Sequence, residues 1–356
     1  MGHAGSRTPE PRETPAAWAG LSELERRLLN DFQRDFPLVP EPWAELARTL
    51  GTEAAVVTEA LWQLRGQGMV SRVGPVFRPH SVGTSTLAAM AVPPERLEAV
   101  ARQVSACAQV NHNYEREHRL NLWFVVAAAD EAQLERCLRD ITRETGLEVL
   151  SLPLLEAYHL DLGFDLHGKR RRRQPPPGHA APARTRLRDP ADLALVAAVQ
   201  QGLPLVPRPF AAVGAQAGLA EAEVIERLRA WHAGGVISRI GVVVRHHELG
   251  FRANAMVVWD IPDARVSETG WCMAGFDFVT LCYQRPRRLP RWRYNLFCMI
   301  HGRDREEVLE QVAELERGCG LEAAPHEVLF SVRRFKQCGA RYQGFGNGAR
   351  PQARSA

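Results

Sequence analysis

Apolar residues near the start of the chain recur three or four positions apart, which is the spacing of one face of a helix. This pattern predicts short amphipathic helices over 21–32, 43–50 and 53–67. A run rich in β-branched residues follows at 69–77 and predicts a strand. Three short helices followed by a strand are typical of a winged helix-turn-helix.

The hydrophobic pattern then changes to that of a small α+β domain. Helices are predicted over 94–105 and 131–144, and strands over 84–92, 110–116, 120–128 and 147–155. The order strand, helix, strand, strand, helix, strand is that of a ferredoxin-like fold. The first half is therefore predicted to join a helix-turn-helix unit to a ferredoxin-like domain.

The same pattern occurs a second time. Segment 70–83 recurs as 237–250, a spacing of 167 residues. In the second half, helices are predicted over 192–201, 208–217, 221–233 and 304–317. Strands are predicted over 251–261, 276–284, 293–302 and 321–335. A repeat at fixed spacing outweighs any single local prediction. The predicted fold class is α+β, a tandem repeat of a winged helix-turn-helix plus a ferredoxin-like (βαββαβ) domain.

This repeat divides the chain into seven segments. They are a disordered tail (1–20), a helix-turn-helix unit (21–83), a ferredoxin-like domain (84–163), a basic proline-rich linker (164–188), a second helix-turn-helix unit (189–250), a second ferredoxin-like domain (251–342) and a disordered tail (343–356).

Composition narrows the class of protein. Of the 356 residues, 45% are hydrophobic, which is enough for each half to bury a core. No apolar run is long enough to cross a membrane and no signal peptide is recognised, so we expect a soluble cytoplasmic protein with no membrane partner. The seven cysteines contain no C-x-x-C pair, and we interpret them as free thiols with no metal site. A net charge of +4 is compatible with an anionic partner.

The helix-turn-helix units offer poor chemistry for DNA. Their third helices carry Glu53, Glu59, Glu221, Glu223 and Glu226. Carboxylates in the turns that face a groove repel phosphate, whereas recognition needs cations and donors to base edges. We therefore expect a scaffold rather than a DNA reader.

Cations and imidazoles repeat on the strand that follows each helix-turn-helix. Alternate residues of a strand share a face, which groups Arg239, Arg245 and His247 in the second copy and places His246 on the opposite side. The first copy has Arg72, Arg78 and His80 at the corresponding positions. Buried cations without an anion are costly, so this repeated group is a candidate site for an anionic ligand.

A second repeated motif is Tyr-x-Arg, followed by a basic turn and Asn-Leu-aromatic. In the first copy His112, Tyr114 and Arg116 are predicted to share a face, and Tyr283 begins the motif of the second copy. The second turn is longer and places five arginines around an aromatic residue: Arg285, Arg287, Arg288, Arg291, Arg293 and Trp292. Arginine pairs with carboxylates and stacks on flat rings, so this turn is predicted to bind a planar ligand with several carboxylates.

These motifs resemble the sirohaem decarboxylases, which are Lrp/AsnC-like proteins. The resemblance rests on Arg-x-Gly with Val-x-Arg-His-His-Glu-Leu-Gly-Phe, and on Asn-His-Asn-Tyr-x-Arg with Asn-Leu-Trp-Phe. It covers nearly all of 20–163 and 188–342, in the order of a D-type subunit fused to an L-type subunit.

The resemblance implies removal of two acetate carboxyl groups of sirohaem, giving 12,18-didecarboxysirohaem for the dioxo-haem of nitrite reductase. The expected proton donors are His112 and His247, with Tyr114 and Tyr283 as hydrogen-bond donors and the arginines as carboxylate clamps. His246 is a further candidate as donor or iron ligand. No cofactor is expected beyond the iron of the substrate. The expected partners are sirohaem and its product, and further decarboxylase subunits or a second copy.

Two questions stay open at the level of sequence. The first copy has Pro79 where the second has His246, and the second has Leu281 where the first has His112. This difference fits either a composite site between the halves or a single site that has lost activity. An Lrp/AsnC-type transcriptional regulator and a non-catalytic tetrapyrrole carrier are the alternative functions.

Overall fold

The structure is a computed structural model that describes residue 18 and residues 20–160 and 186–340. The first predicted tail except Trp18 and Gly20, the whole second tail and most of the predicted linker lie outside the described residues, and Trp18 is buried in the core rather than part of a disordered tail. Across the described part of the chain, no helix is both long enough and apolar enough to pass through a bilayer.

The first helix-turn-helix unit forms where the apolar pattern predicted it. Its elements are α2 (Glu23–Asn30), α3 (Pro42–Leu50), α4 (Ala54–Gly66) and β1 (Val70–Phe77). Ser22 and Glu25 cap the start of α2 reciprocally, and Gly51 ends α3 in the left-handed conformation.

The second helix-turn-helix unit repeats this order. Its elements are α7 (Pro190–Val199), α8 (Pro209–Ala217), α9 (Glu221–Ala233), β7 (Ile237–Val244) and the 3-10 helix η2 (His246–Leu249). β7 therefore ends before Arg245, and β1 ends before Arg78. The predicted strand face does not extend to the histidines of either copy, because the backbone has already left the strand.

The two units are joined by an antiparallel pair of equivalent strands. β1 pairs with β7, and Gly74 lies opposite Gly241, its own equivalent in the repeat. This pairing relates the halves by a local pseudo-twofold axis. A side chain at Gly241 would lie 2.4 Å from the carbonyl oxygen of Phe32, so the close packing of α2 and its turn against β7 requires glycine here. One shared hydrophobic core holds both units together.

Each half continues into the predicted ferredoxin-like order. The first comprises β2 (Thr84–Met90), the 3-10 turn η1 (Pro94–Arg96), α5 (Leu97–Ala106), β3 (Val110–Arg116), β4 (Leu122–Ala128), α6 (Glu131–Thr145) and β5 (Leu150–Pro153). The second comprises β8 (Ala253–Trp259), α10 (Val266–Ala274), β9 (Val279–Gln284), β10 (Leu296–Gly302), α11 (Arg305–Cys319) and β11 (His326–Gln337).

The two ferredoxin-like sheets merge into one sheet of nine strands. The order is β5-β2-β4-β3-β11-β8-β10-β9-β6, with β6 spanning Glu156–Leu160. β11 first pairs with β8 of its own half and then with β3 of the first half, while β6 leaves the first half and pairs with β9. The last strand of each half thus pairs with a strand of the other half.

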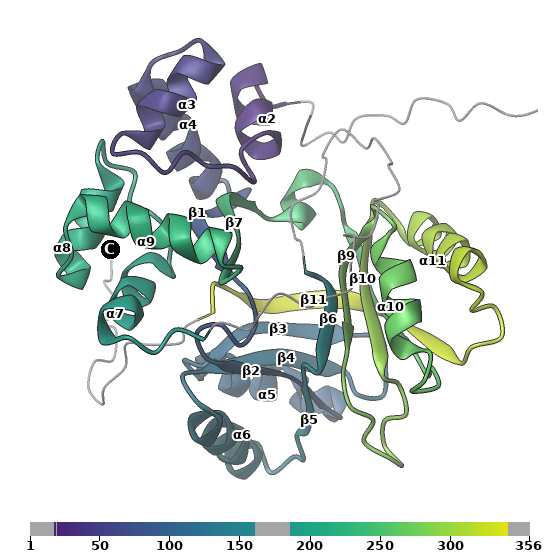
Figure 1. The fold of residues 1–356 in the computed structure, drawn as a ribbon. Coiled ribbons are helices and arrows are strands. Elements are labelled where there is room, and N and C mark those ends of the chain that lie inside the picture. Colours follow the sequence, from purple (N-terminus) through teal and green to yellow (C-terminus); the bar gives the residue numbers. More distant parts are fainter. Residues whose placement is uncertain (1–17, 19, 161–185, 341–356) are drawn as a thin grey trace, which may run out of the picture.

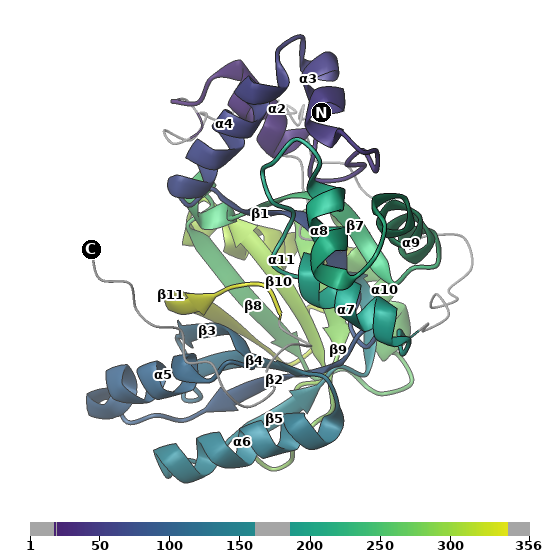
Figure 2. The same cartoon turned by 90° about the vertical axis from the view of Figure 1, so that its left-hand side faces the viewer.

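The helices cover the outer faces of this sheet, and the inner faces meet. In Figures 1 and 2, α5 and α6 lie outside β2–β4, whereas α10 and α11 lie outside the strands of the second half. We call the apolar cluster between the inner faces the central core. Its members from both halves are Leu87, Ala89, Leu120, Trp123, Leu150, Leu152, Met256, Val258, Tyr283, Trp292, Phe297, Met299 and Leu329.

The interpretation of all cysteines as free thiols is wrong. Cys272 and Cys319 form a disulfide that joins α10 to α11. The two residues are 47 positions apart, with Cα atoms 5.9 Å from each other. Sequence spacing could not reveal this pair, because it forms only when the two helices pack side by side on the sheet. The other cysteines that the structure describes are free.

Candidate functional site

β3 carries three of the predicted residues on one face. His112, Tyr114 and Arg116 alternate along the strand after a register shift that follows Val110. The β4 partners of His112 and Tyr114 pack in or against the central core, so all three side chains face the inside of the molecule. The rings of His112 and Tyr114 stack with centroids 6.1 Å apart.

Polar residues continue from β3 across three strands of the second half. Arg116 lies opposite Ser331 on β11, whose hydroxyl is 3.4 Å from the side-chain oxygen of Asn254 on β8. Asn254 in turn lies opposite His301 on β10. We call His112, Tyr114, Arg116, Ser331, Asn254 and His301 the polar row.

Sequence reasoning missed the three members from the second half. His301 continues the inward alternation of Phe297 and Met299, both of which belong to the central core. That alternation was a usable signal for an inward-facing imidazole. The sequence gives no signal that His301 lies near β3, because β11 and β8 separate β10 from β3 in the sheet.

Arg116 is the cation at the centre of the row. Only 6% of it is exposed, and it donates to the carbonyl oxygen of Leu329 at 2.9 Å. Its Nε has no hydrogen-bond partner among the described residues. Burial lowers the pKa of Arg116 to about 10, which still leaves the guanidinium charged at neutral pH.

Three more arginines lie around the first-half end of the row. Arg334 lies opposite Tyr114 on β11 and donates to Glu248 at 3.0 Å. Arg245, directly after β7, donates to the carbonyl oxygen of Gly68 at 3.4 Å. Both act on the Tyr114 hydroxyl electrostatically, while Arg72 on β1 acts on His112. The helix-turn-helix units therefore contribute cations from both copies to one place.

Burial controls the protonation of the two imidazoles. Desolvation, helped by the charge of Arg72, lowers the pKa of His112 to about 4. Desolvation, helped by Arg116, likewise lowers the pKa of His301 to about 4. Burial raises the pKa of Tyr114, so its hydroxyl keeps its proton and can donate.

The histidines after the two strands are placed differently from the prediction. His246 and His247 begin η2, and their side chains lie outside the described part of the structure. His80 lies beyond the end of β1 with a positive φ of 67°, and Arg78 is exposed. The prediction that arginine and histidine alternate on one strand face is therefore wrong beyond the strand ends.

Arg239 and Tyr283 do not join the same site as Arg245. Arg239 is buried on the helix-turn-helix side, where it donates to the carbonyl oxygens of Gln33 at 2.6 Å and Val242 at 3.3 Å. Tyr283 lies in the central core with its ring stacked on that of Phe297. These two residues therefore do not share a site with Arg245, because carbonyl oxygens of the helix-turn-helix side bind the Arg239 guanidinium and the Tyr283 ring packs in the central core.

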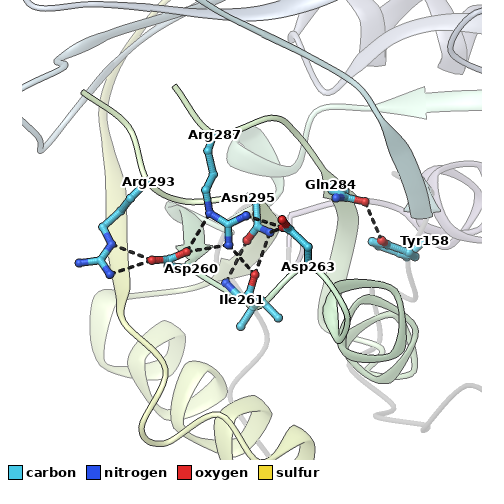
Figure 3. A network of polar contacts seen from close by, with 8 residues as sticks. All are labelled: Tyr158, Asp260, Ile261, Asp263, Gln284, Arg287, Arg293 and Asn295. Carbon is cyan, nitrogen blue, oxygen red and sulfur yellow. Dashed lines mark hydrogen bonds and ion pairs between the residues drawn. The ribbon is translucent and has the colours of Figure 1, made fainter. Parts of the chain in front are cut away.

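The arginine-rich turn between β9 and β10 binds its own protein. Figure 3 shows Arg287 between Asp260 and Asp263, and Arg293 on the other side of Asp260. The Nε of Arg287 donates to Asp260 at 3.0 Å, and that of Arg293 at 2.8 Å. Asp260 and Asp263 follow β8 and are distant in sequence from Arg287 and Arg293, so the pattern of the turn alone does not indicate that these arginines are already paired.

Other residues of this turn form hydrogen bonds and an ion pair with the first half. Arg288 donates to the carbonyl oxygen of Ser151 at 3.0 Å. Arg285 donates to the carbonyl oxygen of Leu152, and Arg291 pairs with Glu148. Trp292 is 1% exposed in the central core, where it cannot stack on a ligand. The structure thus corrects the prediction of a clamp for a planar polyanion at this turn.

Comparisons with known proteins agree with this architecture. A model described as the AsnC-like ligand binding domain matches residues 81–159 and 248–336, and one described as the siroheme decarboxylase NirDL-like HTH domain matches 25–70 and 192–237. The chain is 47% identical to the siroheme decarboxylase NirDL subunit of Paracoccus denitrificans, over 90% of this chain and 97% of that protein.

Other relatives have the same description. The NirDL subunit of Paracoccus pantotrophus is 45% identical over 90% of this chain and 97% of that protein. A crystal structure of the siroheme decarboxylase NirDL matches with a TM-score of 0.65 and 32% identity, covering 90% of this chain and 95% of that chain. Such identity over almost the full length of both proteins shows that the chain belongs to the siroheme decarboxylase family, in its fused NirDL form.

Proposed function

We propose that the chain is a carboxy-lyase that converts sirohaem to 12,18-didecarboxysirohaem at the polar row, in biosynthesis of the nitrite-reductase dioxo-haem. The observation that carries this proposal is Arg116, a buried guanidinium with no carboxylate partner among the described residues, between His112 and His301. A buried cation of this kind is stabilised by an anion brought by a ligand.

The relatives support the chemical class of that ligand. The fused relatives are named siroheme decarboxylase, and one solved relative was crystallised with an iron-uroporphyrin III analogue. Sirohaem is a flat macrocycle that carries several carboxylates. Arg72, Arg245 and Arg334 extend the positive charge of Arg116 toward the helix-turn-helix units, as a large polyanion would require.

Each decarboxylation has a simple balance of bonds and protons. The bond between the acetate methylene and its carboxyl carbon breaks, carbon dioxide leaves, and the electron pair stays on the methylene carbon next to the pyrrole ring. One proton then converts that carbon to a methyl group. The chain can lower the barrier by holding the departing carboxylate and by placing an acid beside the new methyl carbon.

His112 is our proposed acid, and Tyr114 and Arg116 are the groups that hold the carboxylate. In the substrate-free protein His112 is neutral near pH 7, because desolvation and Arg72 lower its pKa to about 4. The carboxylates of the bound substrate oppose both effects by adding negative charge. We therefore propose that substrate binding raises the pKa of His112 and so supplies the acid with its proton.

His247 and His246 remain candidate donors, and His246 a candidate iron ligand. Their backbone follows Arg245 directly, and the charge of Arg245 acts on Tyr114. Tyr283 and the arginine-rich turn are no longer part of the proposed site, because the first is in the central core and the second is paired with the protein itself.

Anaerobic incubation with sirohaem and mass spectrometry of the product tests the proposal. Loss of two molecules of carbon dioxide is expected, without an added cofactor. An unchanged ligand that stays bound would show a tetrapyrrole carrier instead. Absence of binding, together with salt-dependent DNA binding, would show a regulator.

The proposed partners follow from the separate subunits among the relatives. Relatives named NirD, NirL and NirH match 42%, 40% and 43% of this chain. We propose that the chain associates with a further subunit of this kind or with a second copy. Size-exclusion chromatography of the chain alone and with a NirH-type subunit would distinguish the two.

A further inference from the structure

The polar row has a counterpart at the equivalent place in the other half. The Tyr-x-Arg motif puts Tyr283 of β9 and Arg285, directly after β9, where β3 has Tyr114 and Arg116. Following the repeat across the sheet completes what we call the counterpart row, formed by Leu281, Tyr283, Arg285, Ser85 and Ala127.

The counterpart row lacks both imidazoles. Leu281 stands in the place of His112. The cross-strand pair Asn254 and His301 of β8 and β10 corresponds to Ser85 and Ala127 of β2 and β4. No group that could exchange a proton near neutral pH is left at either place.

The counterpart row keeps Arg285 but has no equivalent of Arg334, and its tyrosine is buried. Ala157 of β6 lies opposite Tyr283, whereas Arg334 of β11 lies opposite Tyr114. Tyr283 is 6% exposed, and Arg285 stacks on its ring at 4.5 Å. His112, Tyr114, Asn254, Ser331 and His301 are all only half-buried. The rows therefore differ in access at two positions, since Tyr283 and Ala127 are buried where Tyr114 and His301 are half-buried, whereas Leu281 and Ser85 are half-buried like His112 and Asn254.

We infer that the chain holds one substrate site rather than two, and that His301 of the second half completes it as a second proton donor. This inference rests on the proposed function. The site is composite, because β3 supplies His112 while β8, β10 and β11 supply Asn254, His301 and Ser331. The counterpart row is an interface between the halves.

The chemistry of the reaction fits a row with two imidazoles. Each loss of carbon dioxide consumes one proton at a methylene carbon, so the full conversion consumes two. His301 lies opposite Asn254 in the sheet and two residues after Met299, whose sulfur is 3.9 Å from the Arg116 guanidinium. An acetate carboxylate held by Arg116 would thus be within the same row as both imidazoles.

The number of sites is tested by titration of the full chain with iron-uroporphyrin III, followed by absorbance and native mass spectrometry. One molecule per chain is expected. Two molecules per chain with equal affinity would overturn the single-site inference, whether or not sirohaem is decarboxylated.

The role of His301 is tested with His301→Gln and His301→Ala, measuring turnover of sirohaem, binding of iron-uroporphyrin III and thermal stability. We expect turnover to fall about 100-fold, the usual effect of losing a general acid, with binding and folding kept. Ser85→Ala, at the equivalent of Asn254, is the matched control and should keep wild-type turnover.

The outcomes separate the inference from the proposed function. If the unmodified chain decarboxylates sirohaem and both His301 variants do so at the same rate, the role of His301 is overturned while the proposed function stands. If the unmodified chain binds sirohaem without loss of mass, the proposed function itself fails.

Discussion

β3 and β9 occupy the same place in the repeat and carry the same Tyr-x-Arg motif, but their neighbours differ. Around Tyr114 and Arg116 lie imidazole, amide and hydroxyl groups with further arginines. Around Tyr283 and Arg285 lie aromatic and aliphatic groups and the arginine-rich turn. One copy of a motif can thus be kept for chemistry while the other is used for packing, and the neighbouring strands decide which.

The largest expected effect on turnover comes from replacing His112 of the first half by leucine, the residue found at the equivalent position 281 of the second half. His112→Leu should lower sirohaem turnover about 100-fold or more, because the acid is removed while the strand and the arginines remain. Turnover is measured by mass spectrometry of the product. Leu281→Met, which changes the equivalent position, should leave turnover unchanged. Wild-type turnover in His112→Leu would break the contrast between the two rows.

Trp292→Ala tests the structural side of the comparison. Trp292 is fully buried against Trp123 of the first half, with ring centroids 5.2 Å apart. Its removal should lower the free energy of unfolding by about 3–5 kcal/mol, measured by urea denaturation. Leu289→Ala in the same turn should have little effect, since Leu289 is 71% exposed. Lost substrate affinity without lost stability would instead place this turn in the site.

The two equivalent arginines provide a matched pair of variants. Arg116→Met should weaken binding of iron-uroporphyrin III by about 10- to 100-fold, because a charge-assisted hydrogen bond to a carboxylate is lost. Arg285→Met should leave that affinity unchanged and lower stability, because Arg285 donates to the carbonyl oxygen of Leu152 in the first half and stacks on the buried ring of Tyr283. Equal losses of affinity in both variants would show two similar sites.

The smallest effect is the dependence of stability on pH. The pKa of His112 is lowered to about 4 in the folded protein by desolvation and Arg72, against about 6.5 in the unfolded chain. The unfolded chain therefore binds the proton first as the pH falls. Stability is kept above about pH 6.5 and declines toward pH 4.

For a half-buried group we expect a loss of about 1 kcal/mol between pH 7 and pH 5. Urea denaturation of the unmodified chain, His112→Leu and Leu281→Met at several pH values measures it. The slope should be smaller in His112→Leu alone, and an identical slope in all three would show that His112 is not desolvated.

The sequence by itself determined the repeat, the order of the elements and the inward face of β3. These depend on the spacing of apolar residues along the chain, and such spacing is visible in one dimension. The motif around Tyr114 and Arg116 also identified three members of the polar row, because alternate residues of a strand share a face.

Only the tertiary structure decided which cations are available to a ligand. Packing between segments that are distant in sequence pairs Arg287 of the arginine-rich turn with Asp260 and Asp263. The same kind of packing brings Cys272 and Cys319 together in a disulfide. His301 and His112 belong to one polar row because β11 pairs with β8 of its own half and with β3 of the other, which merges the two sheets. Contacts across a sheet depend on strand order, and strand order is settled when the whole chain folds.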